Sequence, residues 1–260
     1  LCLPLIGFGQ NVNIPDFNFK AYLVGDTAIN TNGDNEIQVM EANSFNGSIH
    51  CNNMNISDLT GIEEFINITE LFCEDNLLTN LDLSNNISLE VLICKYNQIT
   101  HLDLSNNTAL TILHCHNNQL ISLDIRNGNN YALNVGSNVS NPTTIADSFW
   151  ALDNPNLNCI SVDNPNYSYQ SWPNIDPWTS FSGSCSYYGC TDSLSVNYNP
   201  YSNTDDGSCN CYAIADIGAD TISGCDSVLL STNSIVNGTY SWTSNFPHSL
   251  NDIVPNLNSD

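Results

Sequence analysis

Apolar and polar positions repeat with a period of 21 residues between positions 71 and 125. Three columns of identical residues mark this period: Cys73, Cys94 and Cys115; Asn76, Asn97 and Asn118; Leu81, Leu102 and Leu123. Self-similarity at such a period is typical of a solenoid, in which each repeat forms one rung. Alternating apolar residues in L-x-C and in L-D-L predict short strands in each rung.

Weaker copies lengthen the repeat on both sides. Residues 49–56, IHCNNMNI, begin a rung at Cys51. Residues 133–140, LNVGSNVS, put Val135 in the cysteine position, and residues 157–164, LNCISVDN, put Cys159 there. We therefore predict six rungs within residues 48–167.

The cysteine column is expected to face the interior as reduced thiols. Leu and Cys in L-x-C point to the same side of a strand, and a free Cys packs as a small hydrophobic residue. Adjacent rungs lie about 4.8 Å apart, but parallel strands hold their Cβ vectors side by side, so these do not converge for a disulfide. The predicted thiols are Cys51, Cys73, Cys94 and Cys115. A redox-active or metal-binding column is the alternative.

Two further columns are polar. An inward Asn at each turn can satisfy backbone groups left unpaired where strand becomes loop, which we favour over a ligand-binding role. Outward aspartates occur between the leucines of L-D-L and L-D-I, at Asp82, Asp103 and Asp124. Such a row of like charges is expected to be solvated, bonded to turn amides, or bridged by calcium.

The repeated unit L-x-x-L-x-C-x-x-N-x-L/I-T-x-L-D-L-S-N-N resembles the leucine-rich repeat, in the Cys-containing form of secreted proteins from Bacteroidota-type bacteria. The resemblance implies a mainly β leucine-rich repeat solenoid with few helices. It also implies export to the cell surface, by a type IX secretion route.

A solenoid of this kind offers one strand face to ligands, and we expect that face to be concave. The residues on either side of each cysteine face solvent there, with Tyr96 and Asn117 just beyond. They are His50, Asn52, Phe72, Glu74, Ile93, Lys95, His114, His116, Asn134 and Gly136. We select Phe72, Glu74, Ile93, Lys95, His114 and His116 as candidate ligand-binding residues, because exposed apolar groups beside hydrogen-bonding neighbours suit a protein or a glycan. His114 and His116 alone do not make a transition-metal site.

Residues 11–47 are predicted to form a helical N-terminal cap. NIPDFNFKAYLVGD places Pro15 in a helix first turn, apolar residues along one side and Gly25 as a stop. The next segment, 30–41, resembles an EF-hand or dockerin calcium loop. Its ligands would be Asn30, Asn32, Asp34, the Glu36 carbonyl and Glu41, although Asn30 replaces the usual Asp and Asn35 the usual Gly. A polar turn between capping helices is the alternative.

The repeat dissolves beyond residue 141, and we place a C-terminal cap at 168–187. Trp172 and Trp178 are expected to shield the last rung, and Cys159 could pair with Cys185.

The acidic segment 188–211 is bracketed by Cys190 and Cys209. It resembles the GCTD…NYNP…DDGSC module of secreted Bacteroidota proteins and, more distantly, thrombospondin type 3 repeats. So small a segment needs a disulfide, a metal or both, and Asp192, Asp205 and Asp206 are the candidate calcium ligands. A disulfide-closed polar spacer is the alternative.

Residues 212–260 resemble the start of an Ig- or PKD-like domain, with alternating strands around an Asn-Gly turn and Trp242 as its core residue. A Cys211–Cys225 bridge would use the last two cysteines. About fifty residues are too few for a complete sandwich, so we expect a fragment of a longer protein.

Composition supports export. The apolar residues 1–10, LCLPLIGFGQ, are read as a signal-peptide remnant cleaved near Gly9 or Gln10, with an apolar strand as the alternative. Lys and Arg number 3 against 27 Asp and Glu, and the formal charge of -24 disfavours nucleic acid and anionic membranes as partners. Cys2 lies in this remnant, so ten of the 11 cysteines remain in the mature chain. An even number of cysteines in an exported chain normally indicates disulfides, but the cysteine column of the repeat is the exception described above.

No nucleophile motif, phosphate loop or H-E-x-x-H pattern occurs in the sequence. We therefore expect that the chain is not an enzyme. The predicted function is an extracellular or cell-surface adhesion module, calcium-stabilised, that binds a protein or a glycan and does not insert into a membrane. The alternative is a non-catalytic ancillary region of a larger secreted hydrolase.

Overall fold

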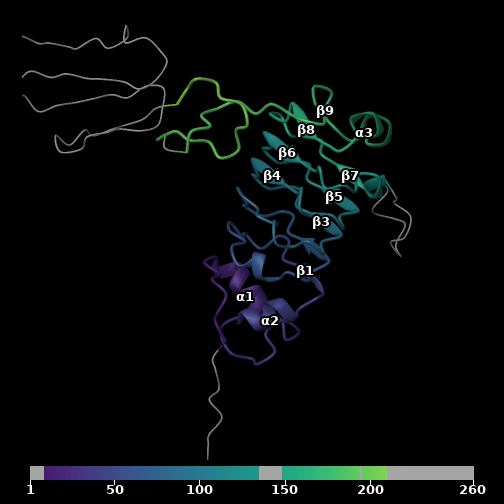
Figure 1. Ribbon diagram of the computed structural model, residues 1–260. Coiled ribbons are helices and arrows are strands. Elements are labelled where there is room, and N and C mark those ends of the chain that lie inside the picture. The colour runs from purple at the N-terminus through teal and green to yellow at the C-terminus, as the bar shows by residue number, and fades with distance from the viewer. Residues whose placement is uncertain (1–8, 135–147, 194, 210–260) are drawn as a thin grey trace, which may run out of the picture.

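The computed structural model describes residues 9–134, 148–193 and 195–209. Two parallel sheets run along a solenoid, with helices α1 and α2 at one end and α3 and β9 at the other (Figure 1). The five-stranded sheet has the order β1 (Ser48–His50), β2 (Glu70–Phe72), β3 (Val91–Ile93), β5 (Ile112–His114) and β7 (Phe149–Trp150). The four-stranded sheet has the order β4 (His101–Asp103), β6 (Ser122–Asp124), β8 (Cys159–Ser161) and β9 (Ser180–Ser182). The described helices are α1 (Phe17–Gly25), α2 (Val39–Ser44), α3 (Pro165–Ser171) and the 3-10 turns η1 (Ile62–Glu64) and η2 (Ala132–Asn134). The mainly β leucine-rich repeat solenoid predicted from the sequence is confirmed.

Leucines and cysteines fill the interior of the solenoid. Leu71, Leu92 and Leu113 are register partners on successive strands, and all three are fully buried. The four predicted thiols follow the strands directly, and all are free and buried, which confirms the prediction. Burial raises the pKa of the Cys115 thiol to about 12, so this column is chemically quiet at neutral pH.

The asparagine column bridges successive rungs, as predicted. Asn97 donates to the carbonyl oxygens of Cys73 and Cys94, while its own oxygen accepts from the Leu78 amide. Asn76 and Asn118 repeat these contacts one rung before and one rung after. Each buried amide thereby satisfies backbone groups of two neighbouring turns.

The prediction for the fifth and sixth rungs is wrong in register. Strand β5 pairs with β7, so Ala151 occupies the cysteine position of the fifth rung, and Asn154 continues the asparagine column by donating to the Cys115 carbonyl. Val135, which the sequence pattern put there, lies outside the described residues. Cys159 belongs to β8 in the other sheet, where Ile160 pairs with Leu123. The prediction from the 21-residue period was wrong because Ala151 lies 36 positions after Cys115.

A second asparagine column, not predicted, lies near the four-stranded sheet. Asn107 donates to the carbonyl oxygens of Leu83 and Asn86, and Asn127 donates to Asn107 in turn. Asn86 and Asn107 are fully buried. The sequence signal was present, because these residues are the second Asn of the repeated L-S-N-N.

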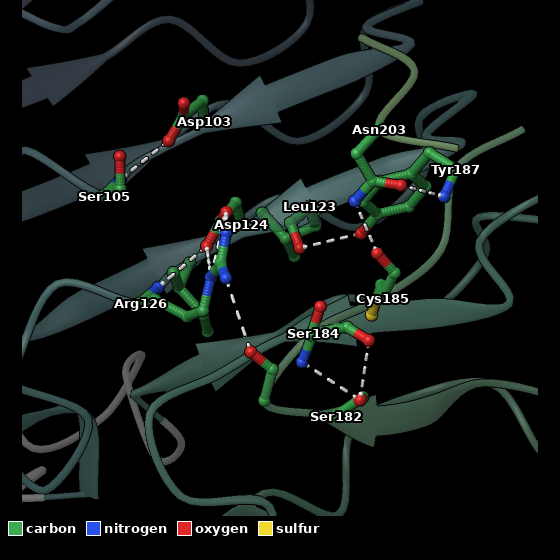
Figure 2. A network of polar contacts seen from close by, with 12 residues as sticks. Asp103, Ser105, Leu123, Asp124, Arg126, Ser182, Ser184, Cys185, Tyr187 and Asn203 are labelled. Carbon is green, nitrogen blue, oxygen red and sulfur yellow. Dashed lines mark hydrogen bonds and ion pairs between the residues drawn. The ribbon is translucent and has the colours of Figure 1, made fainter. Parts of the chain in front are cut away.

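The outward aspartates bind turn amides, which was one of the three expected arrangements. Asp82, Asp103 and Asp124 accept from the amides of Ser84, Ser105 and Arg126 at 3.0, 2.9 and 3.0 Å. Figure 2 shows the last two, together with the ion pair between Asp124 and Arg126.

Helix α1 begins after the N-cap residue Asp16, so Pro15 does not lie in its first turn as predicted. Asp16 accepts from the amides of Asn18 and Phe19 with one carboxylate oxygen, and from the amide and hydroxyl of Ser57 with the other. Pro15 therefore precedes the N-cap, because the Asp carboxylate supplies the better cap for the free amides. Helix α1 buries Phe19 and Leu23 over the first rung.

At the other end, one of the two predicted shielding tryptophans is correct. Trp172 is 2% exposed and stacks on Phe149 with ring centroids 4.5 Å apart, whereas Trp178 is 53% exposed. Strand β9 pairs with β8, so the four-stranded sheet continues into the segment predicted as a cap, and Phe181 on β9 fills the space next to Trp172.

Two disulfides join Cys159 to Cys185 and Cys190 to Cys209, as predicted. The segment between the second pair contacts the solenoid: Tyr201 stacks on His101 at 3.8 Å between ring centroids. Tyr187 lies just before this segment, and its hydroxyl donates to the Cys159 carbonyl at 3.2 Å. The same hydroxyl contacts the Leu123 carbonyl (Figure 2). The predicted Cys211–Cys225 bridge and the Ig- or PKD-like segment 212–260 lie outside the described residues.

Candidate functional site: the outer face of the five-stranded sheet

The strand register aligns outward side chains of the five-stranded sheet in columns. We call this surface the sheet face. One column runs through His50, Phe72, Ile93, His114 and Trp150. A second column runs two residues further along each rung, through Asn52, Glu74, Lys95, His116 and Leu152. Backbone hydrogen bonds such as Asp75 N to Lys95 O and Tyr96 N to His116 O hold the second column in the same register.

Aromatic contacts occur at two places on the sheet face. His50 stacks on Phe72 with ring centroids 4.5 Å apart and 6° between the planes. Three rungs further on, Trp150 packs against His116 at 4.8 Å and against His114 at 5.8 Å. Tyr96 meets the edge of His116 at 5.6 Å, so His116 is held between Tyr96 and Trp150.

The six predicted ligand-binding residues share this face, but they are not equally exposed. Phe72, Glu74 and Lys95 are partly exposed. Ile93, His114 and His116 are only 5%, 6% and 8% exposed, contrary to the expectation that they face solvent. Trp150 contacts both histidines, and Ile93 packs with Val91 and Ile112 in a small apolar cluster on the sheet.

Three other residues complete the comparison with the sequence prediction. Trp150 was missed, because the longer fifth rung hid its alignment with His114; the spacing Ala151-x-x-Asn154 was the available signal. Asn134 ends η2 instead of a strand, and Gly136 lies outside the described residues.

Lys95 has a special place in the charge pattern. Of the three cationic side chains in the sequence, Lys20 pairs with Glu36 at 2.7 Å and Arg126 pairs with Asp124. Within the described residues Lys95 forms no salt bridge; its Nζ lies 5.7 Å from the centre of the Tyr96 ring. The sheet face therefore carries a cation that has no ionic partner in the part of the chain that the structure describes.

His116 is held neutral. Burial lowers its pKa to about 4, and the charges of His114 and Lys95 act in the same direction, against a smaller opposite effect of Asp153. Its Nδ1 and the Oε2 of Glu74 are buried polar atoms without a hydrogen-bond partner among the described residues.

The loop 30–41 turns its oxygens partly onto itself. Asn32 Nδ2 and Gln38 Nε2 both donate to Asp34 Oδ2 at 3.1 Å. Glu41 accepts from the amides of Thr31 and Gln38. Burial raises the pKa of Glu41, but its hydrogen bonds outweigh burial and lower the pKa below the ordinary value. Calcium binding by this loop stays a prediction, and it would require the amides of Asn32 and Gln38 to turn their oxygens toward the ion beside Asp34 and Glu41.

Two other predicted ligands of the loop have partners of their own. Asn30 is 5% exposed and donates to the carbonyls of Val24 and Asp34. The Glu36 carboxylate pairs with Lys20, which leaves its backbone carbonyl as the group it could offer.

The acidic residues of the C-terminal module cap their own turn. Asp205 and Asp206 accept from the amides of Gly207 and Ser208 at 3.0 and 2.9 Å. In the part of the chain that the structure describes, no three His, Cys, Asp or Glu side chains gather closely enough to hold a metal ion. A calcium site at Asp192, Asp205 and Asp206 stays a prediction, and it would have to recruit backbone or amide oxygens.

Comparison with solved structures finds partial similarity to bacterial proteins. The functional domain of InlJ from Listeria monocytogenes, which includes a cysteine ladder, is 26% identical with a TM-score of 0.36; the match covers 59% of this chain and 38% of that one. The internalin inlF from L. monocytogenes str. 4b F2365 is 21% identical with a TM-score of 0.43, over 66% and 46% of the two chains. The CBM51-2 and INT domains of ZmpB from Clostridium perfringens are 24% identical with a TM-score of 0.28, over 36% and 20%.

This chain spans less than half the length of these solved structures. No protein-family model and no curated protein matches it. Among the described residues, no helix has the length and apolar character needed to cross a membrane.

Proposed function

We propose that this chain is a non-catalytic binding module of an exported or cell-surface protein, and that it holds an extracellular protein or glycan on the sheet face. The observation that carries the proposal is the alignment of partly exposed Phe72, Glu74, Lys95 and Trp150 on one rigid sheet. Cysteine and asparagine columns fix the backbone beneath them, so the face is organised before a ligand arrives.

The two disulfides support an extracellular location. Cys159–Cys185 and Cys190–Cys209 form in an oxidising compartment and persist there. The excess of negative charge on the chain disfavours nucleic acid and anionic lipid as ligands. Export through a type IX route and a Bacteroidota-type source remain part of the proposal, on the resemblance of the repeat.

The test is binding of the full chain to two panels, one of purified extracellular proteins and one of glycans. The variants Phe72→Ala and Trp150→Ala should each weaken a specific interaction at least tenfold, because both remove partly exposed aromatic area from the sheet face. Trp178→Ala, which removes an exposed tryptophan elsewhere, should bind like the parent. Equal binding by all three variants would locate the ligand away from the sheet face and reject the proposal.

Calcium stabilisation is a separate part of the proposal and rests on the loop 30–41. Asp34 and Glu41 would supply the negative charge, with oxygens of Asn30 and Asn32 and the Glu36 carbonyl as further ligands. Calorimetric titration with CaCl2 should show one weak site that Glu41→Gln removes. A titration curve that Glu41→Gln leaves unchanged would exclude this loop.

A further inference from the structure

One end of the sheet face combines two aromatic rings with two opposite charges. Trp150 and Tyr96 hold His116 between them, and Glu74 and Lys95 precede His116 in the same column. We call these five residues the Trp150 cluster. The inference rests on the proposed function, which requires only that the sheet face binds a ligand. The chemistry of this cluster indicates the class of ligand.

Tyr96 is an unusual residue for its turn position. Its φ is 55°, in the left-handed region that aromatic residues rarely occupy, and 48% of its surface is exposed. The same turn position holds Asp75, Asn117 and Asp153 in neighbouring rungs, also with positive φ. Asn and Asp tolerate this conformation better than Tyr, and an exposed ring adds nothing to the core. Beyond its edge contact with His116, the exposed part of the Tyr96 ring is available to a ligand.

The polar members of the cluster have unused hydrogen-bonding capacity. Glu74 Oε2 and His116 Nδ1 lack partners among the described residues, and Lys95 forms no salt bridge there, even with Glu74 one rung away. Buried polar atoms without partners are uncommon and call for an explanation. Glu74 and Lys95 are partly exposed, so a ligand rich in hydroxyl groups could donate to the Glu74 carboxylate and accept from the Lys95 ammonium.

The exposed apolar area suits a small ligand better than a protein. Val91, Ile93 and Ile112 cover one another and are 5–6% exposed, so they offer little area to a partner. A stable protein interface buries about 800 Å² on each side. Aromatic faces next to a few placed polar groups are instead typical of small-molecule sites.

We propose that the Trp150 cluster binds a neutral oligosaccharide. The C–H faces of sugar rings stack on Trp150 and Tyr96, and sugar hydroxyls bond to Glu74 and Lys95. The ligand is neutral because the chain carries a formal charge of -24 and Glu74 stands beside Lys95, so an anionic sugar gains little from Lys95 and is repelled by the rest.

The experiment applies the full chain to an array of neutral gluco-, manno- and galacto-oligosaccharides beside sialylated and sulfated counterparts, followed by calorimetry on the best binder. Trp150→Ala and Tyr96→Asn should each weaken binding at least tenfold, and Lys95→Met several-fold. Tyr96→Asn keeps a residue that suits the left-handed turn. Trp178→Ala and Tyr188→Ala, which remove exposed rings elsewhere, should stay within twofold of the parent.

The possible failures are distinguishable. If the sheet-face variants abolish binding to an extracellular protein while no neutral oligosaccharide binds, the proposed function stands and the oligosaccharide inference falls. Preference for the sialylated or sulfated sugars also overturns the inference of a neutral ligand. If neutral sugars bind but Trp150→Ala and Tyr96→Asn bind equally well, the sugar site lies outside the Trp150 cluster and the oligosaccharide inference falls. The proposed function then falls only if Phe72→Ala also binds like the parent. Should Trp150→Ala fail to fold, Tyr96→Asn and Lys95→Met decide the outcome.

Discussion

Asn97 donates a hydrogen bond across the rung boundary to the carbonyl oxygen of Cys73, at 3.0 Å. The same amide reaches the Cys94 carbonyl of its own rung at 3.1 Å. Side chain and backbone thus lock the asparagine and cysteine columns together, so that neither can shift without the other.

Asn97→Ala should lower the free energy of unfolding by about 2–4 kcal/mol, because it removes two buried hydrogen bonds to the Cys73 and Cys94 carbonyls and leaves the Leu78 amide without its acceptor. Chemical denaturation measures the change. The neighbouring exposed Gln98→Ala should change stability by less than about 0.5 kcal/mol. Equal effects of the two substitutions would contradict the bridging role of Asn97.

The four thiols of the cysteine column should resist alkylation in the native protein, even at pH 9. Burial raises the pKa of Cys51 and Cys115 to about 12 and that of Cys73 and Cys94 well above the ordinary value, so almost no thiolate forms. Iodoacetamide labelling with peptide mass mapping should find all four modified only after unfolding. Labelling of Cys73 or Cys94 in the folded chain would show that the column is open to solvent.

Removing the Cys159–Cys185 disulfide should destabilise the solenoid by about 3–4 kcal/mol, since it closes a loop of 26 residues. The double variant Cys159→Ser, Cys185→Ser tests this in thermal unfolding. The matched double variant Cys190→Ser, Cys209→Ser removes the other disulfide, which closes a loop of 19 residues outside the solenoid. It should loosen mainly that segment, which proteolysis between residues 190 and 209 would report. Solenoid stability that is unchanged in the first double variant would rule out the predicted contribution.

His116 should remain neutral down to about pH 4. The unfolded chain protonates its histidines near pH 6.5, so it binds more protons than the folded chain between about pH 6.5 and 4. The contribution of His116 to stability is therefore full above pH 6.5 and declines as pH falls toward 4. His116→Gln should flatten this decline, and NMR titration of the imidazole should give the low midpoint directly. An imidazole midpoint near 6.5 would contradict the packing between Tyr96 and Trp150.

The interior of the repeats could be predicted because one packing problem recurs in every rung. Cys73, Cys94 and Cys115 solve it with the same small apolar volume, and the sequence displays that identity directly. The fifth rung could not be predicted in the same way, because its extra length moves Ala151 and Trp150 out of the period. Their place is set by pairing between β5 and β7, which is a contact in space and leaves no fixed spacing in the sequence.

The exposure of the site residues was harder to predict than the side of the sheet on which their side chains lie. Alternation placed His114 and His116 correctly on the outer side of the sheet, but Trp150 from the next rung covers them. The tryptophans of the cap show the same limit: composition indicated that aromatic residues seal the last rung, yet only Trp172 reaches Phe149. Which ring turns inward depends on the path of the chain between α3 and β9.

The long fifth rung has a practical consequence. Asn154 reaches Cys115 as closely as Asn118 reaches Cys94, at 3.1 and 3.0 Å, although many more residues separate it from the preceding member of its column. The scaffold thus accepts added length between two rungs without losing the spacing of those that follow. Variants that lengthen the chain between β6 and β7 should therefore keep the pairing of β5 with β7, so rung length can be engineered separately from sheet register.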